Sequence, residues 1–293
     1  MINNYIIAEL DIEEENINKK IRIINSFEQF KREYELEDEE EDYKYQNENE
    51  IKENCKIKNN NKIISFSYFY TFNKKGKFII QYSFLNNLTK SNYLFCGCNY
   101  LTNIDLSNFN TENITNMNDM FLGCESLKNI DFSNFNTSNV NNMSCMFNLC
   151  KSLTNINLFN FKTKKVTDMS GMFLGCRSLL SIDLSNLNTQ NVTNMNSMFC
   201  GCISLININL LNINTQNVTN MNSMFYECKS LTSLDLSNLN TQNVINMGCM
   251  FFGCSSLINI DLFNINNKNI LDKKDMFNGC NSLINKNYKF FYI

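Results

Sequence analysis

The chain has 293 residues, of which 43% are hydrophobic and 12% aromatic, so it is long enough for one large domain or two ordinary domains with a core. Its formal net charge of −3 and the lack of a basic stripe argue against nucleic-acid binding. Histidine is absent, which excludes histidine-dependent triads and H-E-x-x-H zinc sites. No run of about 18 apolar residues and no secretory-signal pattern is present, so we expect neither a membrane-spanning segment nor a cleaved leader.

Residues 1–85 differ from the rest of the chain and are predicted to form a β-rich N-terminal domain. Their Ile-rich and aromatic runs are bounded by polar turns and predict strands over residues 5–12, 19–27, 51–58, 62–72 and 77–85. Alternate residues from Ile64 to Phe72 are apolar, which is the period-2 pattern of a strand. We therefore expect an immunoglobulin-like or other small sandwich here.

Two polar features lie among these predicted strands. Ser26 is a candidate cap for a short helix over residues 27–35. The like-charged run EDEEED at residues 37–42 predicts a solvated loop, with a calcium site or a basic partner as the alternative.

From residue 86 onward the Asn-rich chain consists of 26-residue repeats without gaps. One cysteine marks each copy, at Cys98, Cys124, Cys150, Cys176, Cys202, Cys228, Cys254 and Cys280. A fixed period of this length predicts a repeat architecture in which each copy buries its apolar residues against its neighbours. The last copy carries Lys273 in place of Met and runs into KNYKFFYI, which we interpret as a C-terminal cap.

Each copy contains two successive patterns. The L-x-x-L-x-L spacing of Leu231, Leu234 and Leu236 is typical of leucine-rich repeats and predicts a short strand over residues 233–237. Steps of three and four predict a short α- or 3₁₀-helix as the return arm, with an inward stripe of Val218, Met221, Met224, Phe225 and Cys228. The predicted fold class is therefore an α/β repeat solenoid over residues 86–293, with a parallel sheet, short helices and about eight coils, preceded by the β-rich domain.

Two rows of equivalent residues have structural interpretations. An Asn row is predicted to bond the backbone of adjacent copies, at Asn108, Asn134, Asn160, Asn186, Asn212, Asn238 and Asn264. The eight repeat cysteines are expected to be buried, reduced thiols. The C-x-C pairs Cys96–Cys98 and Cys200–Cys202 suggest a soft-metal site as an alternative, but a closed zinc site needs four ligands together. We predict no metal and no cofactor.

The repeat unit resembles that of a known family. The pattern L-x-x-I-D-L-S-N-x-N-T-x-N-V-x-x-M-x-x-M-F-x-x-C-x-S, as in residues 179–204, is similar to the 26-residue repeat of BspA-like leucine-rich-repeat surface proteins of mycoplasmas, other bacteria and anaerobic protists. The similarity covers about residues 86–285. It implies a surface or secreted protein that binds host or neighbouring-cell proteins and has no catalytic residues. Because no leader or anchor is visible in the sequence, a cytoplasmic location is the alternative.

The concave face of a repeat solenoid is the usual partner surface, and here two rows lie between the strand leucines. One is Asp105, Asp131, Asn157, Asp183, Asn209, Asp235 and Asp261, and the other is Ser107, Ser133, Phe159, Ser185, Leu211, Ser237 and Phe263. The second row alternates large apolar residues with Ser from Phe159 onward. This alternation indicates either exposed apolar contacts for a protein or glycan partner, or a relic of duplicated two-copy units. The candidate partner-binding residues are Asp105, Asp131, Phe159, Asp183, Leu211, Asp235, Asp261 and Phe263.

The function predicted from these features is a non-enzymatic protein-binding or adhesion scaffold. Its partner is expected to be a protein or glycoprotein, and the sequence indicates no oligomeric state. The alternative is an intracellular structural or assembly module built from the same solenoid. An enzyme is a poor third prediction, because histidine, a glycine-rich phosphate loop and a distinct acid pair are all missing.

Overall fold

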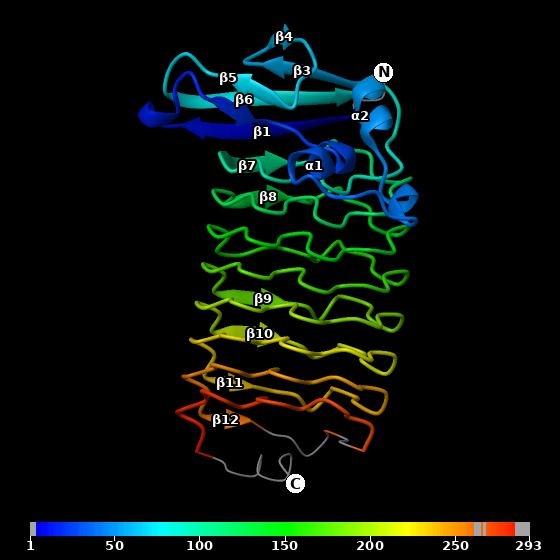
Figure 1. Ribbon diagram of the computed structural model, residues 1–293, viewed down its shortest axis with the longest axis vertical. Helices are drawn as coiled ribbons and strands as arrows, with labels where there is room; N and C mark the ends of the chain where they lie inside the picture. The colour runs from blue at the N-terminus through cyan, green and yellow to red at the C-terminus, as the bar shows by residue number, and fades with distance from the viewer. Residues whose placement is uncertain (1–3, 261–264, 266–267, 285–293) are drawn as a thin grey trace.

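A sheet at the N-terminal end continues into a stack of 26-residue repeats, each of which lies on the one before it (Figure 1). The computed structural model describes residues 4–260, 265 and 268–284. Within these residues the chain consists mostly of short strands and turns. Its helices, α1 (Phe27–Glu33), α2 (Glu48–Asn54) and the 3₁₀ turns η1 (Glu14–Asn16) and η2 (Asp42–Lys44), all precede the repeats. The predicted cap KNYKFFYI lies outside the described residues.

The N-terminal region contributes strands β1 to β6, which are Tyr5–Ile12, Lys20–Arg22, Cys55–Asn59, Lys62–Ile64, Phe69–Thr71 and Gly76–Phe84. Four of them join the first repeats in one sheet of order β4-β3-β6-β1-β7-β8, while β2 pairs with β5. Strand β1 is antiparallel to both β6 and β7 (Leu101–Asp105), so it covers the open edge of the first repeat. The division at residue 85 stays a prediction: β6 ends at Phe84, but β1 carries the same sheet into the repeats.

Two local predictions in this region have different outcomes. Ser26 does cap α1, because its hydroxyl accepts a hydrogen bond from the Gln29 amide at 3.1 Å. The strand predicted over residues 51–58 begins only at Cys55, because α2 occupies the preceding residues. Acidic Glu48 and Glu50 in the first turn of α2 and Lys52 in its last turn match the helix dipole, and this charge pattern explains the helix.

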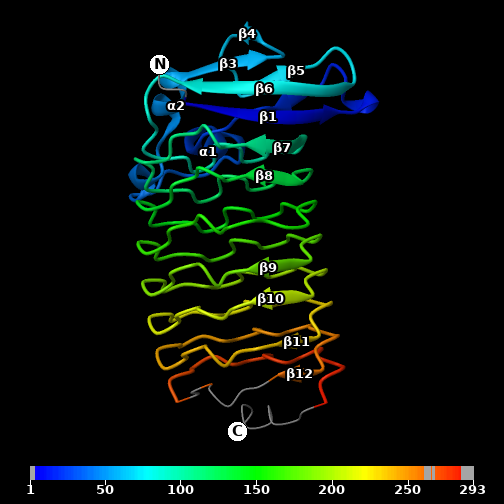
Figure 2. The same cartoon turned by 180° about the vertical axis from the view of Figure 1, so that it is seen from behind.

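Successive repeats are joined by backbone hydrogen bonds on two sides. On one side lie the short strands β7, β8 (Asn129–Asp131), β9 (Ser181–Asp183), β10 (Asn207–Asn209), β11 (Ser233–Leu234) and β12 (Asn259–Ile260), with parallel pairing in β7–β8, β9–β10 and β11–β12. On the other side single parallel bridges run from Lys90 through every repeat to Asp272. Figures 1 and 2 show the strands above one another along one edge of the stack.

The predicted helix in the return arm is wrong: this arm is a series of turns. Ser197 and Gly201 have φ values of 55° and 73°, which a right-handed helix does not allow. The amides of Ser197 and Phe199 donate to carbonyls of the next repeat, at 2.8 and 2.9 Å, and those of Met198 and Cys200 bond three residues back. Backbone groups thus find partners in the adjacent copy, and the steps of three and four that suggested a helix reflect consecutive turns.

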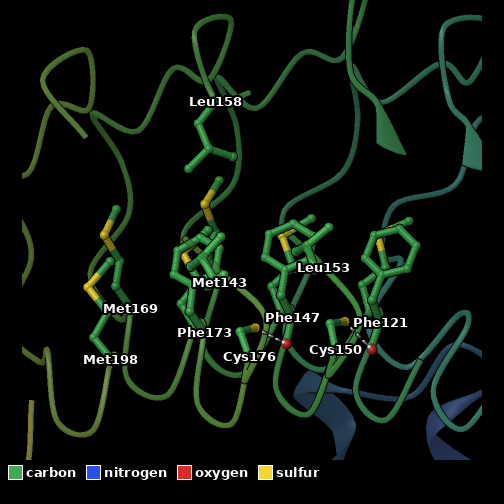
Figure 3. Packing of buried hydrophobic residues seen from close by; sticks show 14 of the residues in the cluster. Phe121, Met143, Phe147, Cys150, Leu153, Leu158, Met169, Phe173, Cys176 and Met198 are labelled. Carbon is green, nitrogen blue, oxygen red and sulfur yellow. Dashed lines mark hydrogen bonds between the residues drawn. The ribbon is translucent and has the colours of Figure 1, made fainter. Parts of the chain in front are cut away.

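The core is a set of identical side chains stacked through the repeats. Phenylalanine rings of adjacent copies are nearly parallel, with centroids 5.3 to 5.7 Å apart, from Phe95 through Phe121, Phe147, Phe173, Phe199, Phe225 and Phe251 to Phe277. Beside them Cys176 Sγ donates to the Phe147 carbonyl at 3.1 Å, and Cys150 repeats this contact with Phe121 (Figure 3). The repeat cysteines are free thiols, as expected for core residues.

Side chains also bond one copy to the next. The predicted Asn row does so at Asn134, Asn160 and Asn212, whose amides donate to carbonyls of the preceding repeat at 2.8 to 3.1 Å. A buried Thr column, which the sequence reasoning missed, does the same: the Thr189 hydroxyl donates to the Asn214 carbonyl and accepts from the Asn214 amide. The Thr bonds satisfy polar groups inside the stack, whereas the Asn bonds join the copies at the exposed surface.

One carboxyl group is partly buried where the N-terminal region meets the repeats. Tyr93 packs against Phe27 and Phe30 of α1, with ring centroids 5.5 and 4.7 Å apart. Asp119 lies next to Tyr93, and its carboxylate accepts a hydrogen bond from the Asn118 amide at 2.8 Å. Burial raises the pKa of Asp119 to about 6, although the hydrogen bonds from Tyr93 and Asn118 lower it in part. Deprotonated Asp119 therefore weakens this junction at neutral pH.

Phe199 and Phe159 form a matched pair for testing the core. Phe199→Ala interrupts the ring stack, and we expect the free energy of unfolding to fall by about 3–5 kcal/mol. Phe159→Ala removes a side chain that is 69% exposed, and we expect a change within about 0.5 kcal/mol. Urea denaturation followed by circular dichroism measures both variants, and similar losses in the two would contradict this assignment of core and surface.

Asp119→Asn should change how stability depends on pH. The folded pKa of about 6 exceeds the unfolded value, so the native state binds more protons between about pH 4 and 6 and loses stability as pH rises through that window. Asn tolerates the φ of 54° at this position and does not ionise. We expect the variant to be more stable than the parent by about 1–2 kcal/mol at pH 7.5, but not at pH 4. A difference independent of pH would contradict the raised pKa.

Candidate functional site

The candidate site is the strand face, formed by the outward side chains of the strand segment in each repeat. In the β9 repeat, Ile182 and Leu184 point into the core, while Ser181 and Asp183 are exposed. Parallel pairing places Ser181 beside Asn207 and Asp183 beside Asn209 of β10. Equivalent residues therefore form columns with a spacing of about 4.8 Å.

The Asp/Asn column has a structural task in every described copy. Each side-chain oxygen accepts a hydrogen bond from the backbone amide two residues later, at 2.8 to 3.1 Å, in Asp105, Asp131, Asn157, Asp183, Asn209 and Asp235. This Asx turn directs the chain out of the strand. Predicted Asp261 lies outside the described residues. The acid row therefore has a structural role in the turns that follow the strand segments.

Two carboxylates of this column, Asp183 and Asp235, have pKa values below the ordinary value. Hydrogen bonds from the Ser185 side chain and amide hold the pKa of Asp183 below its ordinary value, and the Asn209 amide adds to this effect. Ser237 lowers the pKa of Asp235 in the same way. Hydrogen bonding to the charged form is the cause in both cases.

The Ser/apolar column is exposed at Ser133, Phe159, Leu211 and Ser237 and half-buried at Ser107 and Ser185. Phe159 is 69% and Leu211 62% exposed, while Ser185 lies between them in the stack. Two repeat steps separate the two large side chains, which is roughly 9.6 Å. Their backbone amides bond Asn157 and Asn209, so the turn holds both residues in place. Predicted Phe263 lies outside the described residues.

A third column, at the start of the strand segment, was missed in the sequence. Leu180 and Ile206 are 49% and 45% exposed, and Ile258 and Ile284 continue the column further along the stack. The Ile206 amide donates to the Leu180 carbonyl at 2.9 Å, so the two side chains are neighbours. The signal was available, because these residues directly follow the first leucine of each L-x-x-L-x-L segment. Other copies carry polar residues at this position, namely Thr102, Lys128, Thr154 and Thr232, so apolar residues border the polar band of Ser, Asn and Asp in only part of the stack.

The N-terminal sheet extends the strand face at its first repeats. A groove of about 480 Å³ lies over β1, β6, β7 and β8, and Glu9, Ile79, Asp105, Asp131 and Ser133 contribute to its walls. A hydrogen bond from Lys77, with smaller contributions from Asn103 and Thr102, holds the pKa of Glu9 below its ordinary value. The groove therefore presents carboxylates and amides next to exposed Ile79.

The described part of the chain contains no cluster of three or more Cys, Asp or Glu residues arranged to hold a metal ion. Both members of the Cys96–Cys98 pair are buried. Burial raises the pKa of Cys98 to about 12, which disfavours the thiolate that a metal needs. Within the same described residues, no helix is long and apolar enough to cross a membrane.

Comparison with known proteins gives one family and one structure. Residues 64–181 and 167–290 match the family model described as "Mycoplasma protein of unknown function, DUF285", so the matches span residues 64–290 of the 293-residue chain. No curated protein matches the chain. Among solved structures, the chain is similar to the leucine-rich repeat protein TpLRR of T. pallidum, with 19% identity over 49% of this chain and 72% of that chain and a TM-score of 0.30.

Asp183 allows a direct test of the Asx turn. Asp183→Ala removes the acceptor for the Ser185 amide, and we expect the free energy of unfolding to fall by about 0.5–1 kcal/mol, because the turn is solvated. Asp183→Asn keeps an acceptor, as Asn209 does in the next repeat, and should retain the parent stability. Thermal denaturation at neutral pH compares the three proteins. If the Asn variant lost as much stability as the Ala variant, the turn would not depend on this hydrogen bond.

Proposed function

Since the chain belongs to the family described as "Mycoplasma protein of unknown function, DUF285", we propose from its surface that it is a non-catalytic protein-binding scaffold. In this proposal the repeats form a leucine-rich-repeat-like solenoid of the BspA-like type, and the strand face contacts the partner. One observation carries the proposal: Phe159 and Leu211 are 69% and 62% exposed on a face whose other described members are mostly polar. A partner of host or neighbouring cells, and hence an adhesive role, is what the resemblance to BspA-like proteins implies.

The composition of the strand face suits a protein interface. Protein interfaces combine a few large apolar anchors with a polar rim that keeps its hydrogen bonds. Phe159 and Leu211 supply anchors, and complete burial of such a side chain contributes about 1.5–3 kcal/mol. The Asx turns fix the backbone on the strand side of both residues, so binding orders little additional chain.

The charges of the strand face favour a protein or glycoprotein over nucleic acid. Asp183 and Asp235 have lowered pKa values and stay ionised, so they repel phosphate. The same property makes them poor general acids at neutral pH. Each also serves its own turn, which supports a binding role over a catalytic one.

A photo-crosslinking phenylalanine analogue placed at position 159 tests the proposed function. Irradiation of cells that produce this variant should yield covalent adducts with protein, and adding Leu211→Ser should reduce them several-fold. The matched control carries the same analogue at Thr167, an exposed position beside the bridge column on the other side of the stack. Mass spectrometry identifies the adducts. Absence of adducts at position 159, or the same adducts from both positions, would contradict the proposal.

A further inference from the structure

Three columns of the strand face alternate together. The repeats that carry the large residues Phe159 and Leu211 have Asn157 and Asn209 in the Asp/Asn column. The intervening repeats combine Ser185 with Asp183 and Ser237 with Asp235. A third column follows the same two-repeat period, with Asn155, Ser181, Asn207, Ser233 and Asn259. From residue 155 to residue 237, each of the four repeats therefore presents either a large apolar residue with amides, or hydroxyls with a carboxylate. The repeats on either side combine Asn with Asp and do not follow this rule.

These two kinds of repeat are complementary to each other. A large side chain such as Leu211 fits opposite a small one such as Ser185. The side-chain amide of Asn209 bonds Asp183 of its own chain with one N–H group, and its second N–H group can donate to Asp183 of another copy. Repeats of the same kind do not fit, because two of one kind place carboxylate against carboxylate and two of the other kind place large side chain against large side chain. A surface that alternates in this way is complementary to a copy of itself shifted by one repeat.

We propose that the protein partner of the strand face is a second copy of this chain, related by a two-fold axis that runs parallel to the strands between β9 and β10. This inference rests on the proposed function, because it assigns the partner of the same face. Rotation about such an axis reverses the order of the repeats and leaves each column opposite itself. The β9 repeat of one copy then faces the β10 repeat of the other.

The axis pairs unlike residues throughout the central repeats. Leu211 lies opposite Ser185 of the second copy, Asn209 opposite Asp183, and Asn207 opposite Ser181. One repeat further out, Phe159 lies opposite Ser237 and Asn157 opposite Asp235. At the start of the strand segment the same operation brings Leu180 against Ile206, so the exposed apolar column that borders the polar band is also covered.

The expected dimer is weak and reversible. Four repeats at about 4.8 Å and five residue steps at about 3.3 Å give a planar contact of roughly 19 Å by 17 Å. This is below the approximately 800 Å² per partner of a standard stable interface. A contact of this size predicts a weak dimer, and hence a monomer–dimer equilibrium that depends on concentration.

A charge swap within the Asp/Asn column tests the proposal in the full chain. Asn209→Asp opposes carboxylates at two symmetry-related contacts and should raise the dissociation constant of the dimer about tenfold or more. Asp183→Asn combined with Asn209→Asp exchanges the two groups and should restore dimerisation. Each variant keeps a turn acceptor, and neighbouring carboxylates in this column already occur at Asp105 and Asp131. Sedimentation equilibrium over a concentration series measures the association.

A second swap uses size in place of charge. Leu211→Ser should weaken the dimer about tenfold. Leu211→Ser together with Ser185→Leu moves the large residue to the opposing repeat and should restore association. Thermal denaturation of each variant confirms that it is folded.

The outcomes separate this inference from the proposed function. A protein that stays monomeric at all concentrations, or a dimer that is insensitive to Asn209→Asp and Leu211→Ser, would overturn the self-association. Failure of both double variants to restore association would also overturn it. An exchange of residues in this chain restores the contact only when the partner carries the same exchange. Adducts of position 159 with another protein alone would leave the proposed function standing and overturn this inference. Adducts with a second copy, combined with rescue by the swaps, would support both.

Discussion

Backbone hydrogen bonding between successive copies is the constraint on which the rest of the structure depends. The strand segment and the bridge column tie each repeat to its neighbour on two sides, and alternate amides of the return arm do the same. A copy on its own would leave these groups without partners, so the array folds because its neighbours satisfy them. In the first copy, β1 provides the hydrogen-bond partners on the open edge. The N-terminal strands and the first repeats therefore belong to one sheet.

This constraint also determines the side chains inside the stack. Because each residue lies about 4.8 Å from its equivalent, every core position must accept a copy of itself as neighbour. Phe199 satisfies this by stacking its ring nearly parallel to those of Phe173 and Phe225. Thr189 satisfies it by donating to the backbone carbonyl of Asn214 in the next repeat and accepting from the backbone amide of the same Asn214. The interior is filled by residue types that can pack against the same residue type in the next repeat. This requirement accounts for the similarity of the core positions from copy to copy.

The period of 26 residues made the columns, the inward leucines and the exposure of Phe159 predictable from sequence. The return arm was not predictable in the same way, because Met195, Met198, Phe199 and Cys202 have the spacing of both a helix and consecutive turns. The left-handed residues Ser197 and Gly201 decide between them, and only Gly201 indicates such a conformation from its type. The Leu180 column has no constant residue type, since Thr and Lys occur there as well as Leu and Ile, and so it does not stand out in the repeat pattern. The extent of α2 was hidden because its seven residues have only one buried side chain, Ile51.

The hydrogen bonds that form the turns after the strand segments do not require the alternation on the strand face. Asp and Asn both support the Asx turn, and Ser, Phe and Leu all occupy the position two residues later without a change in that hydrogen bond. Duplication of a two-copy unit would produce alternation, but it would do so throughout the unit. The return arms do not follow it: residues 192–199 and 218–225 belong to adjacent copies and have the identical sequence VTNMNSMF. The two-repeat period is therefore a property of the strand side of each repeat. It includes the buried column Leu187, Ile213, Leu239 and Ile265 as well as the exposed face, so contact with a partner does not by itself account for it.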